Sequence, residues 1–242
     1  MQVIASDKSD CKKSENLLKS HTIYQGVQLS RVSKLDGIRS WSLPALETCP
    51  GAKEGGELVD VCQGCYARSG HYRFSAVKQI RAHNKLDWQQ TDWVARMISA
   101  LDADRFFRWM DSGDIYSEVL AEKIFEICSQ TPWVKHWIPT RSHKVPKIKC
   151  ILDKINRLDN AVVRYSSDSI NGEYSTYHGS VVISDPLTLP EGAELCSAHH
   201  SGKCNSCRNC WDKNIRVIAY VAHGRTMKKL NREKLIELKA SM

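Results

Sequence analysis

Residues 107–142 have the sequence FRWMDSGDIYSEVLAEKIFEICSQTPWVKHWIPTRS, which predicts a strand, a short polar turn, a helix and a second strand. The turn holds Ser112, Gly113 and Asp114, and it follows an apolar strand directly. A helix between two strands is the repeating unit of a parallel sheet, whose ligands sit at the C-terminal ends of the strands. The triplet is therefore a candidate binding edge.

The same alternation continues along the chain. Strands are predicted at 37–46, 105–110, 133–139, 161–167, 180–184 and 215–223, and helices at 74–88, 91–103, 116–130 and 145–157, followed by a basic C-terminal helix. This pattern predicts an α/β fold with about six mostly parallel strands, either open or closed into a barrel. We expect a flexible segment over 1–21 and a single α/β domain over 22–242.

Composition indicates a soluble globular protein. Of the 242 residues, 42% are hydrophobic and 26% are charged. No apolar run is long enough to span a bilayer, and the first residues lack the apolar core of a signal peptide, so we expect a cytoplasmic protein without a membrane partner. The net charge of +8 is compatible with nucleic acid as a partner, with an anionic small ligand or with a solvated surface.

Ten cysteines in a cytoplasmic chain argue against a disulfide framework. Cys11, Cys128 and Cys150 are isolated in the sequence. The other seven form a first group, Cys49, Cys62 and Cys65, and a second group, Cys196, Cys204, Cys207 and Cys210. Such close spacing is typical of metal ligands.

The first cysteine group lies in a long loop, residues 48–71. A structural zinc site needs four ligands, and His71 could complete the three cysteines. A [4Fe–4S] cluster held by three cysteines instead leaves one iron open for a substrate or cofactor. Both alternatives fit the spacing.

The second group repeats a two-residue gap, as ferredoxin loops do when successive thiolates reach corners of one cluster. We favour an iron–sulfur cluster with a structural role, and zinc held by the four cysteines is the alternative. His199 and His200 are expected on the surface or behind the ligands, because four thiolates already suffice.

Four motifs resemble the gene-product-eighty-eight family of phages and plasmids across residues 38–223: TCPGA at 48–52, CQGCYA at 62–67, SGD at 112–114 and CNSCRNCW at 204–211. The cysteine loop and the later strand with its triplet also resemble the radical S-adenosylmethionine (SAM) enzymes. That resemblance implies a partial (β/α) barrel with a cysteine-rich cluster loop after the first strand.

The same resemblance implies a reaction. A [4Fe–4S] cluster on Cys49, Cys62 and Cys65 would cleave SAM reductively to a 5′-deoxyadenosyl radical that acts on an unknown substrate, with electrons from a reductant protein. Ser112, Gly113 and Asp114 would contact the methionine moiety, with Asp114 facing its amino group. The alternative for Asp114 is a cap on the helix that starts near Ile115.

Other strand ends add candidates. Ser166 and Asp168 could hold a cofactor ribose or a substrate, or they could simply form a turn. Further candidates for contact with an anionic ligand are Arg73, Arg81, Asn84 and Arg141. The catalytic residue is unknown. A non-enzymatic module, stapled by iron–sulfur or zinc and binding nucleic acid or protein, is the competing function.

Overall fold

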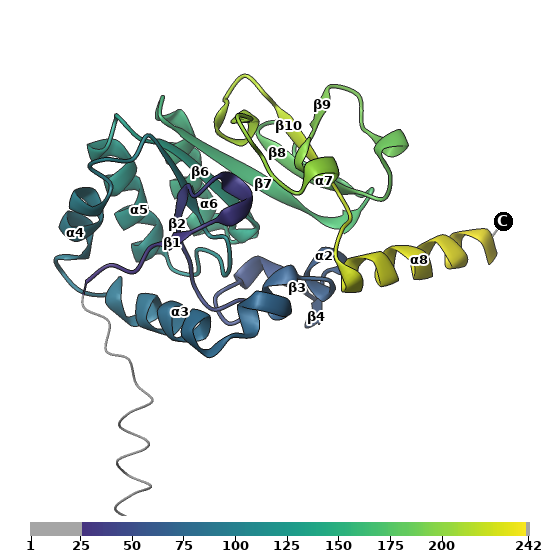
Figure 1. Cartoon of the computed structure of the whole chain (residues 1–242), viewed down its shortest axis with the longest axis horizontal. Helices are drawn as coiled ribbons and strands as arrows, with labels where there is room; N and C mark the ends of the chain where they lie inside the picture. Colours follow the sequence, from purple (N-terminus) through teal and green to yellow (C-terminus); the bar gives the residue numbers. More distant parts are fainter. Residues whose placement is uncertain (1–25, 241–242) are drawn as a thin grey trace, which may run out of the picture.

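The structure is a computed structural model that describes residues 26–240. The predicted flexible segment 1–21 and Cys11 lie outside the described residues. Within them, eight strands form one sheet in the order β1–β2–β5–β6–β7–β8–β10–β9 (Figure 1). All neighbouring strands are parallel except β1 and β2.

The strands of this sheet are β1 (Ser30–Arg31), β2 (Arg39–Trp41), β5 (Phe106–Trp109), β6 (Lys135–Thr140), β7 (Ala161–Ile170), β8 (Gly179–Ile183), β9 (Ala193–Leu195) and β10 (Val217–Val221). A separate hairpin pairs β3 (Lys53–Glu54) with β4 (Glu57–Leu58). The α-helices are α2 (Asp60–Gln63), α3 (Ser75–Asp87), α4 (Trp93–Ala100), α5 (Glu118–Gln130), α6 (Pro146–Arg157), α7 (Ala198–Ser201) and α8 (Arg225–Ala240).

The mostly parallel α/β sheet is confirmed, and it is not closed into a barrel. The sheet is open, because β1 and β9 form its two edges and do not pair with each other. The expected number of strands was too low, since these two edge strands have only two and three residues, too few to show a period. The first cysteine loop accordingly follows β2 rather than the first strand.

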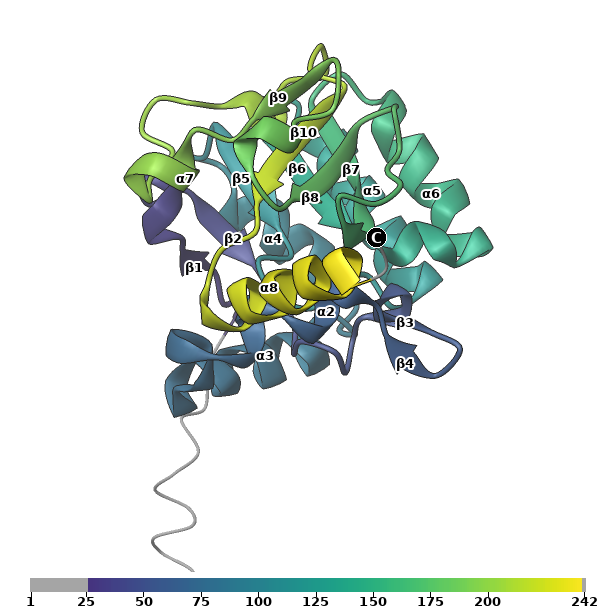
Figure 2. The same ribbon diagram turned by 90° about the vertical axis from the view of Figure 1, so that its right-hand side faces the viewer.

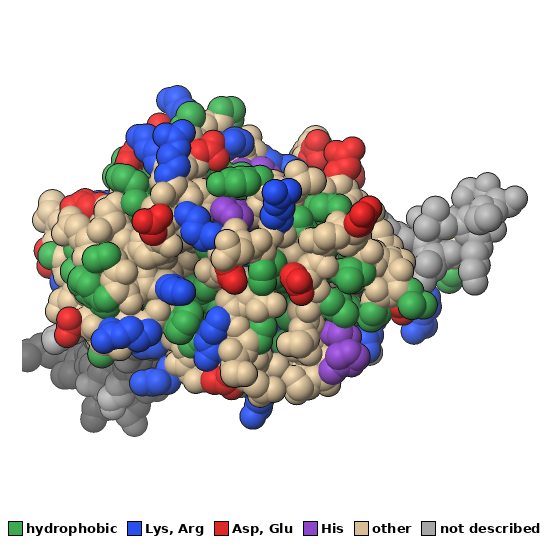
Figure 3. Space-filling view, turned by 90° about the horizontal axis from the view of Figure 1, so that it is seen from above, with side chains coloured by type: hydrophobic (Ala, Val, Ile, Leu, Met, Phe, Trp, Pro, Cys, Tyr) green, Lys and Arg blue, Asp and Glu red, His purple; other side chains and the backbone are tan. Residues whose placement is uncertain are grey.

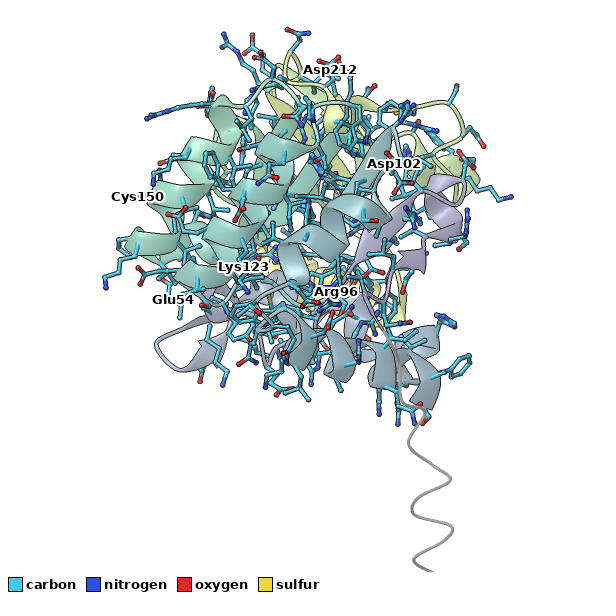
Figure 4. All side chains as sticks on the ribbon, turned by 90° about the vertical axis from the view of Figure 1, so that its left-hand side faces the viewer. Glu54, Arg96, Asp102, Lys123, Cys150 and Asp212 are labelled. Atoms are coloured by element: carbon cyan, nitrogen blue, oxygen red, sulfur yellow. The ribbon has the colours of Figure 1, made fainter. Side chains whose placement is uncertain are left out.

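Helices α4, α5 and α6 cover one face of the sheet, where they share a hydrophobic core with β2, β5, β6 and β7 (Figure 1). In α6, Ile148, Ile151, Leu152 and Ile155 are buried at helical spacing, and Pro146 starts the helix where its missing N–H costs nothing. Cys150 lies on the outer side of this helix, exposed to solvent (Figure 4). It is a surface residue, whereas Cys128 is buried in α5 among apolar side chains.

The other face of the central strands is covered by the second cysteine segment. Strand alternation turns Phe106 and Trp137 toward this side, and the Trp211 ring packs against both, with ring centroids 5.6 and 5.1 Å apart. The Trp211 indole also donates a hydrogen bond to the Phe107 carbonyl at 2.9 Å. Both faces of the centre of the sheet are therefore buried, as parallel strands require. No helix within residues 26–240 is long and apolar enough to cross a membrane.

His136 of β6 is a neutral core histidine. It is fully buried, its Nδ1 accepts a hydrogen bond from the Trp109 indole at 3.2 Å, and its Nε2 lies 2.9 Å from Thr131 Oγ1. Thr131 Oγ1 donates to the Ile127 carbonyl, so it accepts from His136 Nε2–H. Burial lowers the pKa of His136 from 6.5 to about 3.

We predict that His136 makes the protein acid-sensitive. The unfolded chain binds a proton at this histidine below pH ~6.5 and the folded chain does not, so stability is complete above that pH and falls as the pH decreases. Between pH 7.5 and pH 5 the loss should be about 2 kcal/mol of unfolding free energy. Urea unfolding measures the free energy of unfolding at both pH values. The decrease from pH 7.5 to pH 5 should be smaller by this amount in His136→Gln than in the wild type. In His223→Gln, whose histidine is exposed, the decrease should equal that of the wild type. Equal pH dependence in all three proteins would refute the assignment.

Candidate functional site

The first cysteine group lies at the carboxyl end of the sheet. Cys49 and Cys62 pack in a cluster with Ile170, which ends β7, and with Met227 of α8. Helix α8 packs closely on Gly64, where an added Cβ would lie 2.8 Å from Met227 Cε. Apolar packing therefore holds the loop at the edge where parallel sheets bind ligands.

Ser112, Gly113 and Asp114 hold the start of this loop. Ser112 Oγ donates to the Leu43 carbonyl at 2.8 Å, and the Leu43 amide donates back to the Ser112 carbonyl at 2.9 Å. Gly113 has φ +71°, and an added Cβ would lie 2.6 Å from Thr48 Oγ1. The Asp114 amide donates to the Thr48 carbonyl at 3.1 Å. The small polar triplet thus exists to let the backbone approach the residues that precede the first cysteine.

The Asp114 carboxylate joins the ends of β5 and β6. Its Oδ1 accepts hydrogen bonds from Thr140 Oγ1 at 2.6 Å and from the Ile115 amide at 2.8 Å, and its Oδ2 accepts from the Arg141 amide at 2.8 Å. The side chain is buried, which raises its pKa, while these hydrogen bonds lower it. Both oxygens therefore have hydrogen-bond partners within the protein.

The alternative of Asp114 as a helix cap is wrong. Helix α5 begins at Glu118, and Ser117 stands at the capping position. Besides the adjacent Ile115 amide, the carboxylate binds Thr140 and Arg141, which are distant in the sequence.

The loop also rests directly on the end of β6. An added Cβ at Gly51 would lie 2.2 Å from the Arg141 carbonyl oxygen, so glycine is required in the CPGA motif for this close approach. The Arg141 guanidinium turns toward β7 and donates two hydrogen bonds to the Ser167 carbonyl, at 3.0 and 2.6 Å. Three strand ends are therefore tied together beneath the cysteines.

The three thiols of the first group are close enough to affect one another. Burial raises the pKa of Cys49 to about 12, and Asp114 and the thiols of Cys62 and Cys65 act in the same direction. Burial also raises the pKa of Cys62, which the neighbouring Arg141 cation opposes. Thiolates are the form that binds metal, so a bound cation would have to supply the free energy of deprotonation here.

Asp168 and Ser166 lie at this edge too. Asp168 Oδ2 pairs with Lys144, and its Oδ1 is 3.4 Å from Arg141 Nε. That Oδ1 is buried and has no hydrogen bond among the described residues. Ser166 accepts a hydrogen bond from Ser180 Oγ at 3.3 Å, so it joins β7 to β8.

A polar cluster beside Cys65 was not predicted. Tyr66 donates to the Asp111 carbonyl at 2.6 Å and accepts from Arg108 Nη2 at 3.1 Å, while Tyr72 donates to Asp111 Oδ2 at 3.2 Å. Arg81 lies over the Tyr72 ring, 4.5 Å from its centroid. The sequence offered one signal for this cluster, the absence of acidic residues after Cys62. It does not reveal that Asp111 lies beneath the two tyrosines.

Two other candidates have structural partners. Asn84 is buried and donates to the carbonyls of Gln28 and Ser42 at 3.1 and 3.0 Å, so its amide binds the protein itself. His71 packs edge-on against Phe74, with ring centroids 5.1 Å apart. Arg73 is exposed.

The second cysteine group surrounds a small hollow. All four of its cysteines line a cavity of about 20 Å³, together with Trp211 and other neighbours. Cys210 is buried at its base, where burial raises the pKa of the thiol to about 11 and its Sγ lies 3.2 Å from Tyr220 Oη. His199 uses its Nδ1 to bind the Cys196 carbonyl at 2.8 Å, as a residue behind the ligands would.

Neither group has a complete coordination geometry. Within residues 26–240, no three side chains of His, Cys, Asp or Glu are arranged to hold a metal ion. The predicted ligands of each group are thus brought into one place by the fold, but their sulfur atoms do not converge on one point.

Arg164 organises the second cysteine segment, and the sequence did not reveal it. The side chain is fully buried on β7 and donates to four backbone carbonyls, those of Asn209, Cys210, Asp212 and Ile215, at 2.9–3.0 Å. Burial lowers the pKa of its guanidinium. A cation without a buried carboxylate beneath four cysteines suits a site that becomes anionic when thiolates bind metal.

The model of a family described as gene product 88 matches residues 10–188. No curated protein and no solved structure matches the chain.

We predict that Asp114→Asn destabilises the protein by about 2–3 kcal/mol, because an amide nitrogen in place of one oxygen faces a donor that it cannot accept from. Asp102, which is exposed, provides the control Asp102→Asn, for which we expect no change beyond about 0.5 kcal/mol. Chemical denaturation measures both. A fully stable Asp114→Asn would show that the carboxylate is not the tie between β5 and β6.

Replacing Arg164 by Met should lower stability by about 3 kcal/mol or more, because several buried carbonyls lose their donors. Arg216→Met is the matched control, since Arg216 is exposed in the same segment. Thermal melts compare the two variants. Similar melting temperatures would contradict the role given to Arg164.

Proposed function

The chain belongs to the gene product 88 family, and we propose that it is an iron–sulfur protein of the radical-SAM type. In this proposal the first cysteine group holds a [4Fe–4S] cluster at the carboxyl edge of the sheet. The second group holds a structural metal centre. The substrate is a molecule that reaches the same edge.

The observation that carries the proposal is the convergence of three strand ends on one cysteine loop. The end of β5 binds the chain before Cys49, the end of β6 supports Gly51, and Arg141 ties β6 to β7. A surface loop would not require contacts from three strand ends to position its three thiols. Three thiols, rather than four, also suit a cluster that keeps one iron open.

The residues around the loop suit an anionic cluster and a charged cofactor. Arg141 lies close enough to Cys62 to favour its thiolate, and Arg108 borders the other side beside Tyr66. When bound, the cluster would supply the electron for reductive cleavage of SAM, after it has been reduced by a separate reductant protein.

Among the carboxylates of this edge, Asp168 replaces Asp114 as the group proposed to meet the SAM ammonium. Asp114 has both oxygens in hydrogen bonds within the protein, whereas Asp168 keeps one oxygen without a hydrogen bond. Arg141 and Lys144 hold the Asp168 carboxylate in place. The acceptor that an amine needs is therefore available on β7 rather than after β5.

A metal-stapled module without catalysis is the second candidate, and one observation favours it. The hollow of about 20 Å³ inside the second group has the size of a single ion rather than of a cubane cluster. Zinc held by four thiolates would fit such a site. In that case the second group is a zinc staple that fixes the segment on the sheet through Arg164.

Metal analysis tests the two centres separately. Anaerobically purified protein should contain about four irons with labile sulfide, and Cys62→Ala/Cys65→Ala should lose them while retaining the metal of the second group. Cys207→Ala/Cys210→Ala should show the reverse and a lower melting temperature, because metal binding contributes to folding there. Colourless wild-type protein that contains only zinc would refute the radical-SAM proposal in favour of the module.

SAM binding tests the role of Asp168. Calorimetric titration of SAM into cluster-loaded protein should show binding that weakens about ten- to a hundredfold in Asp168→Asn, since a charge-assisted hydrogen bond contributes about 1.5–3 kcal/mol. Asp185→Asn, on the loop after β8, is the control and should bind SAM as the wild type does. No binding by wild-type protein with a full cluster would refute SAM as the cofactor.

A further inference from the structure

The chain carries no acidic residue between Asp60 and Asp87. Over the same stretch it has five basic residues: Arg68, Arg73, Lys78, Arg81 and Lys85. This stretch begins in the first cysteine group and runs through α3. Although the whole chain has 27 acidic residues, this stretch contributes only neutral and basic side chains to the surface beside Cys65.

Aromatic rings form a continuous row on this stretch. The ring centroids of Tyr66 and Tyr72 are 5.4 Å apart, those of Tyr72 and His71 6.4 Å, and those of His71 and Phe74 5.1 Å. Both ends of the row are accessible, with Tyr66 47% and Phe74 61% exposed. Single exposed aromatics are common, but four rings in contact on a basic surface are a specific arrangement.

Arg81 lacks the partner that a buried cation needs. The residue is 7% exposed, its Nε is buried without a hydrogen bond, and its guanidinium makes no ion pair with any described residue. The guanidinium lies over the face of the Tyr72 ring. Because no described residue forms an ion pair with Arg81, an external anion beside the aromatic row would supply its counter-charge.

Neighbouring elements do not neutralise this surface. Glu47 pairs with Lys85 and Glu233 of α8 with Lys229, and the Asp111 carboxylate, which accepts from Tyr72 and Ser42, lies close to Arg108. The side chains of Arg68, Arg73 and Lys78 are exposed and have no ion pair among the described residues. The positive charge of these three exposed side chains therefore stays uncompensated.

Helix α8 extends the basic surface. It packs on the turn between Cys62 and Cys65 through Met227 and Leu230, and Figure 2 shows it running above α3 with α2 beside it. Its exposed Lys228 and Arg232 add to the charge on this side. The face seen from above differs, because basic and acidic side chains are interspersed over it (Figure 3).

We propose that the face formed by residues 66–81 binds single-stranded nucleic acid, which is the class of substrate delivered to the first cysteine group. Bases stack on Tyr66 and Phe74, and phosphates pair with Arg68, Arg73 and Arg81. Exposed rings favour a single strand over a duplex, whose bases are already stacked. As an assignment of substrate this rests on the proposed function, whereas binding itself does not require the cluster.

Fluorescence anisotropy with a labelled twenty-nucleotide oligothymidylate tests the proposal on the full chain at 50 mM salt. We expect Phe74→Ala to weaken binding by about five- to a hundredfold, the range for loss of one base–aromatic stack. Leu187→Ala, at an exposed apolar residue far along the sequence, is the control and should bind as the wild type does. An oligouridylate of equal length shows whether RNA is preferred to DNA.

Salt dependence supplies an independent measurement. Arg73→Gln should reduce the slope of log affinity against log salt by about 0.7, the value for one phosphate contact on a single strand. Lys135→Gln, exposed at the start of β6, should leave the slope unchanged. Thermal melts confirm that each variant is folded.

Three outcomes would overturn the proposal. The first is that no oligonucleotide binds at 50 mM salt. The second is that heparin binds as tightly as the oligonucleotide and Phe74→Ala has no effect, and the third is that the protein binds vesicles containing phosphatidylserine but no oligonucleotide. The last two would identify a general polyanion surface or a membrane surface. Protein that binds SAM through a full cluster but binds no oligonucleotide refutes this inference alone. Protein that binds the oligonucleotide but holds no iron refutes the proposed function and leaves the binding face in place.

Discussion

One buried carboxylate determines how the carboxyl edge of this sheet is built. Asp114 accepts hydrogen bonds from Thr140 and from the Arg141 amide, and so fixes the ends of β5 and β6 relative to each other. Gly51 packs on that same Arg141 backbone, and Gly113 packs on the residues before Cys49. The position of the first cysteine group therefore depends on a buried carboxylate, and the cost of burying it is offset by directed hydrogen bonds.

The two cysteine groups are held in place by different kinds of interaction. Packing of glycine against backbone holds the first, so its loop is defined by shape. A buried guanidinium holds the second, since Arg164 binds four carbonyls of the segment that carries Cys210. A loop held by close backbone packing, as in the first group, can place thiols at an accessible edge. A segment bound to a buried guanidinium, as in the second group, suits a structural role.

Local periodicity predicted most of the helices and strands of this fold. The spacing of Ile148, Ile151, Leu152 and Ile155 determines α6 within its own sequence, and the bounds agree with the structure to about one residue. The partners of Asp114 could not be predicted, because they lie 26 and 27 residues away, beyond any local pattern. Arg164 was missed for a related reason: in AVVRYSS it resembles the outward-facing residue of an alternating strand, and only the fold of residues 209–215 makes that position an interior one. The ligand edge itself could be predicted, because strand order in a parallel sheet brings the strand ends together whatever the side chains do.

Arg108 has a consequence for how the two centres would communicate. It projects from the face of β5 opposite α4–α6, binds Tyr66 next to Cys65, and is near enough to Cys204 to oppose the rise in thiol pKa that burial causes there. A single positive charge is therefore shared between the two cysteine groups. If both groups held metal, negative charge added at one group would attract the same cation that lies near the other, so loading or reduction of one proposed centre would change the electrostatic potential at its neighbour. The two cysteine groups are in this respect electrostatically coupled through one cation.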